Sequence, residues 1–241
     1  MTDKIQELQH LIDTHSRIVF FGGAGVSTES GVPDFRSFDG LYNQKYDYPP
    51  ETILSHSFFM SNVEAFYKFY RDKILIKGIE PNAAHKKLAE MEAAGKLLAV
   101  VTQNIDGLHQ KAGSKTVYEL HGTCARSYCM KCGKQFDLDY VMNTTGVPKC
   151  DKCGGIIKPD VVLYEEGLDD ATVRGAIRSI AAADMLIVGG TSLVVYPAAG
   201  LIDYFQGDKI VLINKGATGR ESMADLVITD PIGEVLSGIR V

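Results

Sequence analysis

Polar side chains follow directly after one of the most apolar stretches of the chain. The run LLAVV, residues 97–101, is succeeded by Gln103, Asn104 and Asp106. Amides and carboxylates at the end of a buried strand are costly unless they bind something. In open parallel sheets, ligands lie outside the carboxyl ends of the strands. We therefore expect these side chains to form the floor of a small-molecule site that relies on directional hydrogen bonds.

A glycine-rich loop follows an earlier strand-like segment. Residues 17–21, RIVFF, lead into Gly23-Ala24-Gly25 and then into small hydroxyl residues. Glycines let the backbone approach a pyrophosphate, and a helix N-terminus favours its negative charge. The G-x-G-x-x-G fingerprint is incomplete because Thr28 stands at its third glycine. Taken alone, this loop fits an ordinary tight turn equally well.

Two later apolar runs also end in small or polar residues, GGTS at 189–192 and INKG at 213–216. Any one such end can be a solvated loop. Four polar ends at one sheet edge instead predict a bound dinucleotide.

Four of the five cysteines form two C-x2-C pairs. The pairs are Cys129 with Cys132 and Cys150 with Cys153, and 17 residues separate them. This spacing is typical of a zinc ribbon. Four thiolates fill the coordination sphere, so the predicted zinc ion is structural rather than catalytic. Cys124 is left over and is expected to be a packed small residue.

Titratable residues near these motifs are candidates for proton transfer. His121 precedes a glycine in YELHGT, and an imidazole suits general-base chemistry near neutral pH. A satisfied core or loop histidine is the alternative. His85 and His109 are expected to be structural or solvated. Asp34 belongs to a loop, PDFRS, that could either close over a ligand or form a surface turn with an internal Asp–Arg pair.

Strands and helices alternate along the chain, which implies a parallel sheet covered on both faces. One of the helices is expected at 61–77, with Ser61 and Glu64 as a capping box. The cysteine-rich stretch interrupts this rhythm and is expected to form a second, smaller lobe. The strands are expected at 17–21, 97–101, 185–190, 209–214 and 225–229.

Composition excludes several classes of protein. The 241 residues are 45% hydrophobic and 23% charged, enough for one large core with a small satellite. A net charge of −5 disfavours nucleic-acid binding through a basic face. No stretch approaches the 18 apolar residues expected of a membrane span. Residues 1–15 have the spacing of an amphipathic helix instead of a signal peptide, so we expect a cytoplasmic protein. In such a protein, grouped cysteines indicate metal binding rather than disulfides.

The combined motifs resemble those of the sirtuins, which are NAD-dependent protein-lysine deacylases. The resemblance runs from about residue 17 to 216 and is strongest to bacterial and archaeal members. It implies deacetylation of acetyl-lysine in proteins, with NAD consumed and nicotinamide and O-acetyl-ADP-ribose released. The segments that carry it are GAGVSTESGVPDFRS, TQNIDGLH, LHGT, the paired C-x2-C, GTSLVVYPAA and INKG.

The resemblance also implies a division into domains. The fold would be α/β, with a Rossmann-like parallel-sheet domain that binds NAD and a smaller lobe formed by insertions. The small lobe would contain a helical module and the zinc ribbon. The NAD-binding domain would comprise residues 1–36, 81–121 and 159–241, and the small lobe residues 37–80 and 122–158.

The same resemblance assigns the first loops of the NAD site. Ala24, Gly25 and Thr28 would line the pyrophosphate. Phe35 and Arg36 would belong to a mobile cofactor loop, with Phe35 shielding the reactive ribose face.

The nicotinamide half of NAD would lie against the loop after residue 102. Gln103 and Asn104 would hold the nicotinamide-side ribose, and Asn104 would count as catalytic. Ile105 and Asp106 would bind the carboxamide. His121 would contact the cofactor as the general base.

The adenosine half would lie at the later strand ends. Thr191, Ser192 and Asn214 would receive it, and Ile232 is a further candidate near the adenine.

An extended acyl-lysine peptide would pair with the segment KPDVVLYEEGL, residues 158–168, by β-augmentation. The chain departs from the commoner family pattern here: Glu165 and Glu166 replace a Gly-Glu pair, and Lys158 replaces an arginine. Two adjacent carboxylates suggest a preference for basic residues beside the lysine. The residues expected to contact the peptide are Val162, Leu163, Tyr164 and Glu165.

Acyl preference follows from a helix expected over the pocket. Family members that favour succinyl or malonyl groups resemble Tyr-x-x-Arg at this place. Here Tyr67 is followed three residues later by Tyr70, and Arg71 is one position off, which turns its side chain by about 100° around a helix. We expect neutral acyl groups, acetyl first.

Two other functions remain open on the sequence alone. Mono-ADP-ribosyl transfer would use the same NAD site with a different nucleophile. A non-enzymatic NAD sensor or ribbon-based adaptor would use the zinc knuckles for a partner. The expected partners are acetylated proteins or peptides, without nucleic acid or membrane, and the chain is expected to be a monomer.

Overall fold

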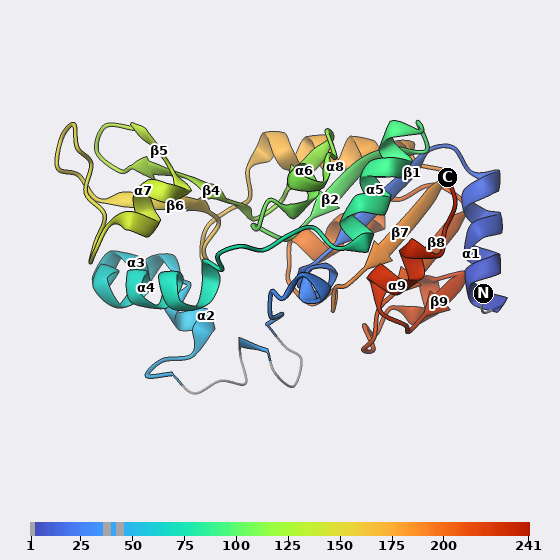
Figure 1. The fold of residues 1–241 in the computed structure, drawn as a ribbon, viewed down its shortest axis with the longest axis horizontal. Helices are drawn as coiled ribbons and strands as arrows, with labels where there is room; N and C mark the ends of the chain where they lie inside the picture. The colour runs from blue at the N-terminus through green and yellow to red at the C-terminus, as the bar shows by residue number, and fades with distance from the viewer. Residues whose placement is uncertain (1–2, 36–39, 42–45) are drawn as a thin grey trace.

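The computed structural model describes residues 3–35, 40–41 and 46–241, and its larger lobe is built on a six-stranded sheet (Figure 1). Every pairing in this sheet is parallel, and the strand order is β3-β2-β1-β7-β8-β9. The five expected strands are confirmed, and β3 is an additional short edge strand. The strands are β1 (Ile18–Gly22), β2 (Leu97–Thr102), β3 (Val117–Glu119), β7 (Met185–Gly189), β8 (Lys209–Ile213) and β9 (Leu226–Ile228).

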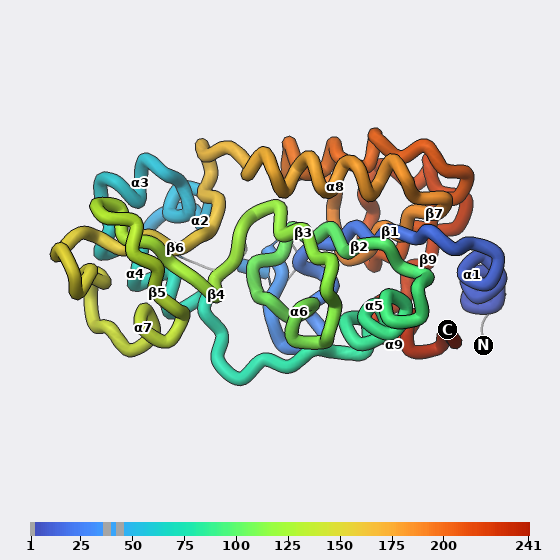
Figure 2. Tube along the Cα trace, turned by 90° about the horizontal axis from the view of Figure 1, so that it is seen from above, coloured from blue at the N-terminus to red at the C-terminus, as the bar shows by residue number. Residues whose placement is uncertain are grey.

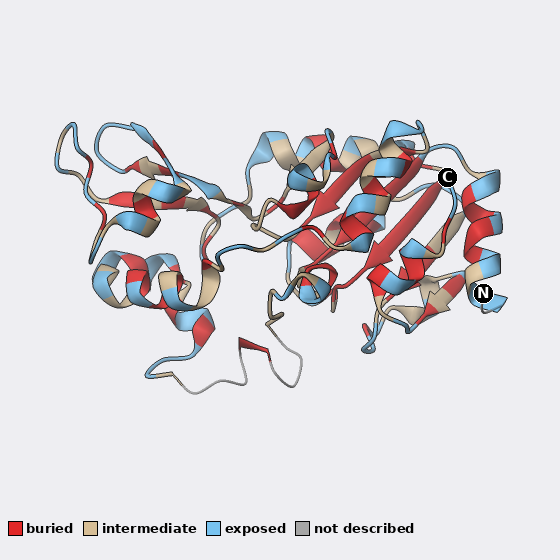
Figure 3. Ribbon diagram, in the orientation of Figure 1, coloured by how far each residue is buried: buried red, intermediate tan, exposed pale blue. Residues whose placement is uncertain are grey.

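Helices cover both faces of this sheet, as Figure 2 shows from above. Alternation along β1 divides its side chains, since Phe20 joins the core under α1, α5 and α9 while Val19 and Phe21 join the core under α8. Buried strands therefore lie between partly exposed helices (Figure 3), and the predicted α/β class is confirmed. The helices are α1 (Asp3–Thr14), α5 (Ala83–Ala93), α6 (Leu108–Ala112), α8 (Asp170–Ala182) and α9 (Ile232–Ser237), with a 3-10 helix at Ala198–Tyr204.

The strand order places a topological switch point at β1. The chain adds β2 and β3 on one side of β1 and then returns to add β7, β8 and β9 on the other. Connections leave the carboxyl ends of β1 and β7 in opposite directions, and open α/β sheets bind ligands in the crevice that results.

The smaller lobe combines an antiparallel sheet, in the order β5-β4-β6, with short helices. Its core is rich in aromatic side chains and is separate from the cores of the large sheet. The domain boundaries given above stay a prediction. The strands are β4 (Gly122–Cys129), β5 (Gln135–Asp137) and β6 (Ile157–Val161), and the helices are α2 (Pro50–Ile53), α3 (His56–Ser61), α4 (Val63–Phe69) and α7 (Leu138–Asn143), with a π-helical turn at Tyr70–Ile74.

The helix expected at 61–77 begins differently. Ser61 ends α3 instead of capping α4, and its hydroxyl donates to the carbonyl of Ser57 at 2.8 Å. Asn62 is the N-cap, because its side-chain oxygen accepts from the amide of Ala65 at 3.3 Å. The predicted Ser61–Glu64 capping box is therefore wrong by one residue.

Two histidines are buried where α5 and α6 meet, so the solvated alternative for them is wrong. His85 and His109 are 0% and 1% exposed, and their rings meet edge to face with centroids 4.7 Å apart. Burial lowers the pKa of His85 to about 4 and that of His109 to about 3. Neither ring nitrogen of His109 has a hydrogen-bond partner among the described residues. Both imidazoles are therefore neutral in the folded protein at neutral pH.

None of the helices in the described part of the chain has the length and apolar character needed to cross a membrane.

We expect replacement of His109 by Phe to remove part of the acid sensitivity of the fold. An unfolded His has a pKa of about 6.5. Between that pH and the lower pKa of the folded state, the unfolded state binds more protons, so the free energy of unfolding decreases as the pH is lowered. At pH 5 this group should cost the wild type about 2 kcal/mol relative to pH 8. Urea unfolding at both pH values measures the loss, with the exposed His10→Gln as control. An unchanged pH dependence in His109→Phe would contradict the buried neutral state.

Candidate functional site

The loops after β1 and β7 meet backbone to backbone. The amide of Gly25 donates to the carbonyl of Gly190 at 2.8 Å, and a Cβ on Gly25 would lie 2.9 Å from the Cα of Gly190. Gly190 has a φ of +57°, and a Cβ there would overlap the backbone nitrogen of Val26. Only glycine permits this approach, so the two glycine-containing ends form one continuous surface at the switch point.

The end of β2 joins the same surface through Gln103. Its amide donates to the carbonyl of Gly22 at 2.9 Å, and its side-chain nitrogen donates to the hydroxyl of Thr191 at 2.9 Å. That hydroxyl also accepts from the amide of Leu193 at 3.2 Å. Three of the four polar strand ends predicted to converge are thus linked directly.

A hydrogen-bonded triad lies behind this edge. Asn104 donates through Nδ2 to Oγ of Ser27 at 3.0 Å, and Oγ donates to Oδ2 of Asp106 at 2.7 Å. The other carboxylate oxygen, Oδ1, accepts from the amide of Leu108 at 2.9 Å, the first residue of α6. The side chains of Asn104 and Asp106 are therefore held in fixed orientations.

Sequence reasoning missed two members of this network, Ser27 and His85. Ser27 is fully buried within the glycine-rich loop, and Nε2 of His85 lies 3.5 Å from its hydroxyl. His85 is held in turn by Asn82, whose backbone amide donates to Nδ1 of His85 at 3.3 Å. The signal for Ser27 was its place among the glycines, whereas nothing local to His85 reveals a contact 58 residues away.

His121 lies beside the same loop. Its Nδ1 is 2.9 Å from the carbonyl oxygen of Gln103, and because a carbonyl oxygen only accepts, Nδ1 carries the proton. Nε2 therefore keeps its lone pair. Burial lowers the pKa of His121, partly opposed by this hydrogen bond. The imidazole is thus a neutral base at neutral pH, next to the predicted ribose-binding residues.

The remaining residues predicted near the pyrophosphate lie on two 3-10 turns, Ala24–Val26 and Thr28–Ser30, instead of on a full helix. Ala24 is half-buried, and Thr28 is exposed and donates to the carbonyl of Gly25 at 3.0 Å. Phe35 is half-buried on the following loop, and Arg36 lies outside the described residues.

The residues predicted for the adenosine half of NAD differ in how far their side chains are exposed. Ser192 and Asn214 are half-buried at the ends of β7 and β8, and Nδ2 of Asn214 donates to the carbonyl of Gly216 at 2.6 Å. Ile232 is only 5% exposed and packs in the core beside Gly189. Its side chain therefore offers little surface to a ligand.

The predicted peptide segment is tied to the base. The amide of Val162 donates to the carbonyl of His121 at 2.9 Å, Leu163 is buried and Tyr164 is 38% exposed. On the other side of the site, Ile105 accepts a backbone hydrogen bond from Cys124 at 2.9 Å. Burial raises the pKa of the Cys124 thiol to about 12, which favours its predicted packing role.

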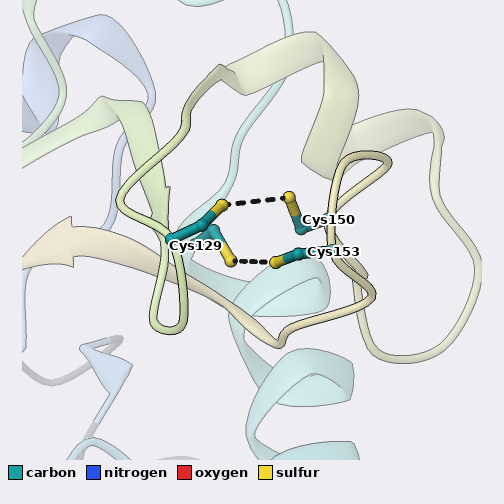
Figure 4. Close-up of side chains that lie close together, drawn as sticks. Cys129, Cys150 and Cys153 are labelled. Carbon is teal, nitrogen blue, oxygen red and sulfur yellow. Dashed lines mark hydrogen bonds between the residues drawn. The ribbon is translucent and has the colours of Figure 1, made fainter.

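The four paired cysteines form one cluster in the small lobe. Figure 4 shows Cys129 facing Cys150 and Cys153 across the gap between two loops. The four sulfur atoms lie within 4.8 Å of one another, and the separations of 3.4 and 3.7 Å are close to the ~3.8 Å of a tetrahedral zinc site. Each pair belongs to a tight knuckle closed by a left-handed glycine, since Gly133 and Gly154 both have a φ of +69°. The cluster is consistent with one structural zinc ion.

Comparisons with known proteins agree on one family. The family model described as "Sir2 family" matches residues 23–197. An NAD-dependent protein deacetylase of Clostridium acetobutylicum is 62% identical over 242 residues, covering 99% of each chain, and one of Clostridium perfringens is 58% identical with the same coverage.

Solved structures give the same result. One is a Sir2 enzyme structure that was solved to explain the mechanism and regulation of these enzymes. It is similar to this chain with a TM-score of 0.90 and 41% identity, and the match covers 98% of this chain and 96% of that one. A Sir2 structure with a deacetylated p53 peptide and 3′-O-acetyl-ADP-ribose matches with a TM-score of 0.90 and 37% identity, covering 98% and 100%.

We expect the wild-type protein to contain one zinc ion per chain. Cys150→Ala removes a buried ligand, and the protein should lose the ion because three thiolates bind it far less tightly. Cys124→Ala is the matched control and should retain it. Atomic absorption of the purified variants measures the content. Retention of zinc by Cys150→Ala would contradict the four-cysteine site.

Proposed function

The chain belongs to the Sir2 family and is an NAD-dependent protein deacetylase, and from this premise we propose how its own residues bind the substrates and carry out the transfer. The proposal places NAD along the carboxyl edge of the sheet, from β2 across β1 and β7 to β8. The observation that carries it is the imidazole of His121, fixed by Gln103 beside the Asn104–Ser27–Asp106 triad.

The glycine-containing ends would hold the pyrophosphate and adenosine. Ala24, Gly25 and Thr28 would line the pyrophosphate, on the loop that packs backbone to backbone against Gly190. Thr191, Ser192 and Asn214 would receive the adenosine half. Ile232 would act only from beneath, as part of the core that supports β7.

The triad would hold the nicotinamide half. Gln103 and Asn104 would bind the ribose, and Asp106 with Ile105 would bind the carboxamide. Bound NAD supplies a ribose carbon that loses nicotinamide to an attacking acyl oxygen. The side chains of Asn104 and Asp106 are oriented in advance, so little conformational freedom is lost when they bind. Phe35 and Arg36 would cover this end of the site.

His121 would act as the general base. Its protonated Nδ1 is occupied by the carbonyl of Gln103, so Nε2 is the atom that accepts a proton from a ribose hydroxyl. Burial lowers the pKa of the imidazole and keeps Nε2 unprotonated at neutral pH.

The acetylated peptide would pair with residues 162–165. Related Sir2 structures hold acetylated or deacetylated peptides, and Val162 connects this segment directly to the backbone of His121. Val162, Leu163, Tyr164 and Glu165 would form one edge of the binding groove.

Neutral acyl groups, acetyl first, would be preferred. The guanidinium of Arg71 lies over the ring of Tyr67, Nε donates to the carbonyl of Val141 at 3.1 Å, and Nη1 donates to that of Gly146 at 2.6 Å. These contacts hold the guanidinium within the small lobe, which supports the proposal that it does not pair with an acyl carboxylate. Tyr70 is buried and uncharged.

We also propose that the protein acts as a cytoplasmic monomer on acetylated protein substrates. Support for the compartment comes from the thiolate cluster, which needs reducing conditions to bind metal.

The role of His121 is tested by His121→Ala. Loss of a general base should lower kcat by about 10²- to 10⁴-fold without changing zinc content or circular dichroism. In the wild type, the base must be unprotonated, so kcat/KM falls as the pH drops through its pKa. Because that pKa is lowered, the midpoint of the acidic limb should lie below about 6.5. A midpoint above this value, or an unimpaired His121→Ala, would overturn the assignment.

Acyl preference is tested with two peptides that differ only in the acyl group. We expect kcat/KM for the acetyl peptide to exceed that for the succinyl peptide by at least about 100-fold, since an unpaired carboxylate would be buried. Tyr70→Arg should narrow the ratio by supplying a cation, and Lys68→Arg, on the exposed side of α4, should not. Equal rates with both peptides in the wild type would show the preference to be wrong.

A further inference from the structure

The segment that follows β6 is joined to the start of α3. The amide of Tyr164 donates to the carbonyl of Leu54, and the amide of His56 donates to the carbonyl of Tyr164, both at 3.0 Å. These bonds form a short parallel bridge between Ser55 and Tyr164. We call residues 54–57 and 163–166 together the clasp.

Two carboxylates close the clasp. Glu165 accepts from both the amide and the hydroxyl of Ser57, each at 2.9 Å. Glu166 lies 2.8 Å from Nδ1 of His56 and accepts from Nζ of Lys158 at 3.0 Å. It also accepts from the amide of Leu163 at 2.9 Å. Both carboxylates are thus engaged inside the small lobe, which weakens the expectation that they select basic residues in the peptide.

Glu165 holds its contacts in an unfavourable backbone conformation. Its φ is +76°, in the left-handed region where a Cβ is disfavoured and glycine is the usual residue. This chain therefore adopts a strained backbone at Glu165 that glycine would relieve. The two hydrogen bonds from Ser57 to the carboxylate are the contacts that a glycine would lack.

The clasp lies on the segment assigned to the peptide. Residues 162–165 form the proposed binding edge, Leu163 is anchored in the small-lobe core, and Val162 is bonded to His121. An extended peptide adds to such an edge most tightly when the edge is already ordered, because less conformational entropy is lost on binding.

We propose that Glu165 is a positioning residue that orders the peptide-binding edge by tying it to the start of α3. This proposal rests on the assignment of residues 162–165 to the peptide. Glu165 acts through the backbone it holds, and it touches neither NAD nor the reacting atoms.

The test compares steady-state kinetics of Glu165→Gln, Glu165→Gly and Ser57→Ala with the wild type. Glu165→Gln keeps the strained backbone and loses the charge, so it should raise KM for the acetylated peptide about 3- to 10-fold. Glu165→Gly relieves the strain but should raise this KM as well, and Ser57→Ala should raise it less. The value of kcat and KM for NAD should stay unchanged. Glu90→Gln, at an exposed position of α5 where the carboxylate also has a partner, is the matched control.

Combining Glu165→Gln with Ser57→Ala should give less than the product of the two single effects, because both remove the same contact. An unchanged KM for the peptide in both Glu165 variants would overturn the proposal. A fall in kcat as large as the rise in the peptide KM would overturn it as well.

Hydrogen exchange separates this proposal from the assignment on which it rests. Bound peptide should protect amides within residues 162–166 of the wild type, and Glu165→Gln should speed their exchange in the free enzyme. If the peptide leaves this segment unprotected, the assigned binding edge is wrong. The peptide could instead protect this segment while the Glu165→Gln variant has the same amide exchange rates and the same peptide affinity as the wild type. In that case only the positioning role is wrong.

Discussion

One buried hydroxyl joins the two loops on which the chemistry depends. Oγ of Ser27, which follows β1, donates to Asp106 and accepts from Asn104, which both follow β2. Such a hydroxyl is satisfied only if β1 and β2 are neighbours and the glycine-rich loop turns tightly enough to bring it between them. The strand order and the close contact of Gly25 with Gly190 meet both conditions. A triad in which each group has a partner is rigid, whereas a partly satisfied one would destabilise the fold.

The two lobes contribute different physical properties to the site. The large lobe supplies a sheet with two apolar faces, whose rigid strand ends present amides, hydroxyls and a carboxylate in fixed positions. The small lobe has a core rich in aromatic rings and four clustered cysteines, so ring packing orders it and a zinc ion held by the cysteines would add to that order. The segment at 162–166 connects them, because Val162 bonds to His121 and Tyr164 bonds to the residues before α3. A peptide bound there would contact both lobes.

Local sequence signals predicted most of this arrangement. Apolar runs located the five principal strands, and the spacing of the cysteines located the metal cluster, because each signal is complete within a few residues. Contacts between distant segments were not predictable in the same way. His85 approaches Ser27 only because α5 packs beside the β1 loop. Asn62 rather than Ser61 caps α4, because Ser61 is the last residue of α3.

The left-handed backbone of Glu165 was not predictable from its residue type, since glycine is expected there. The sequence placed a polar strand end at residues 103–106 and a histidine near it, but the tautomer of His121 required the carbonyl of Gln103. The resemblance to sirtuins assigned roles to individual residues more finely than the residues could by themselves. The assignment of Ile232 to the adenine end stays a prediction of that resemblance, and its side chain is buried in the core.

The central claim is that this edge of the sheet breaks NAD only onto an acylated lysine. The most direct measurement follows nicotinamide release and peptide deacetylation in the same reaction, with and without acetylated peptide. We expect one nicotinamide per lysine deacetylated and negligible release without the peptide. Deacetylation without NAD, or steady nicotinamide release in the absence of peptide, would contradict the claim.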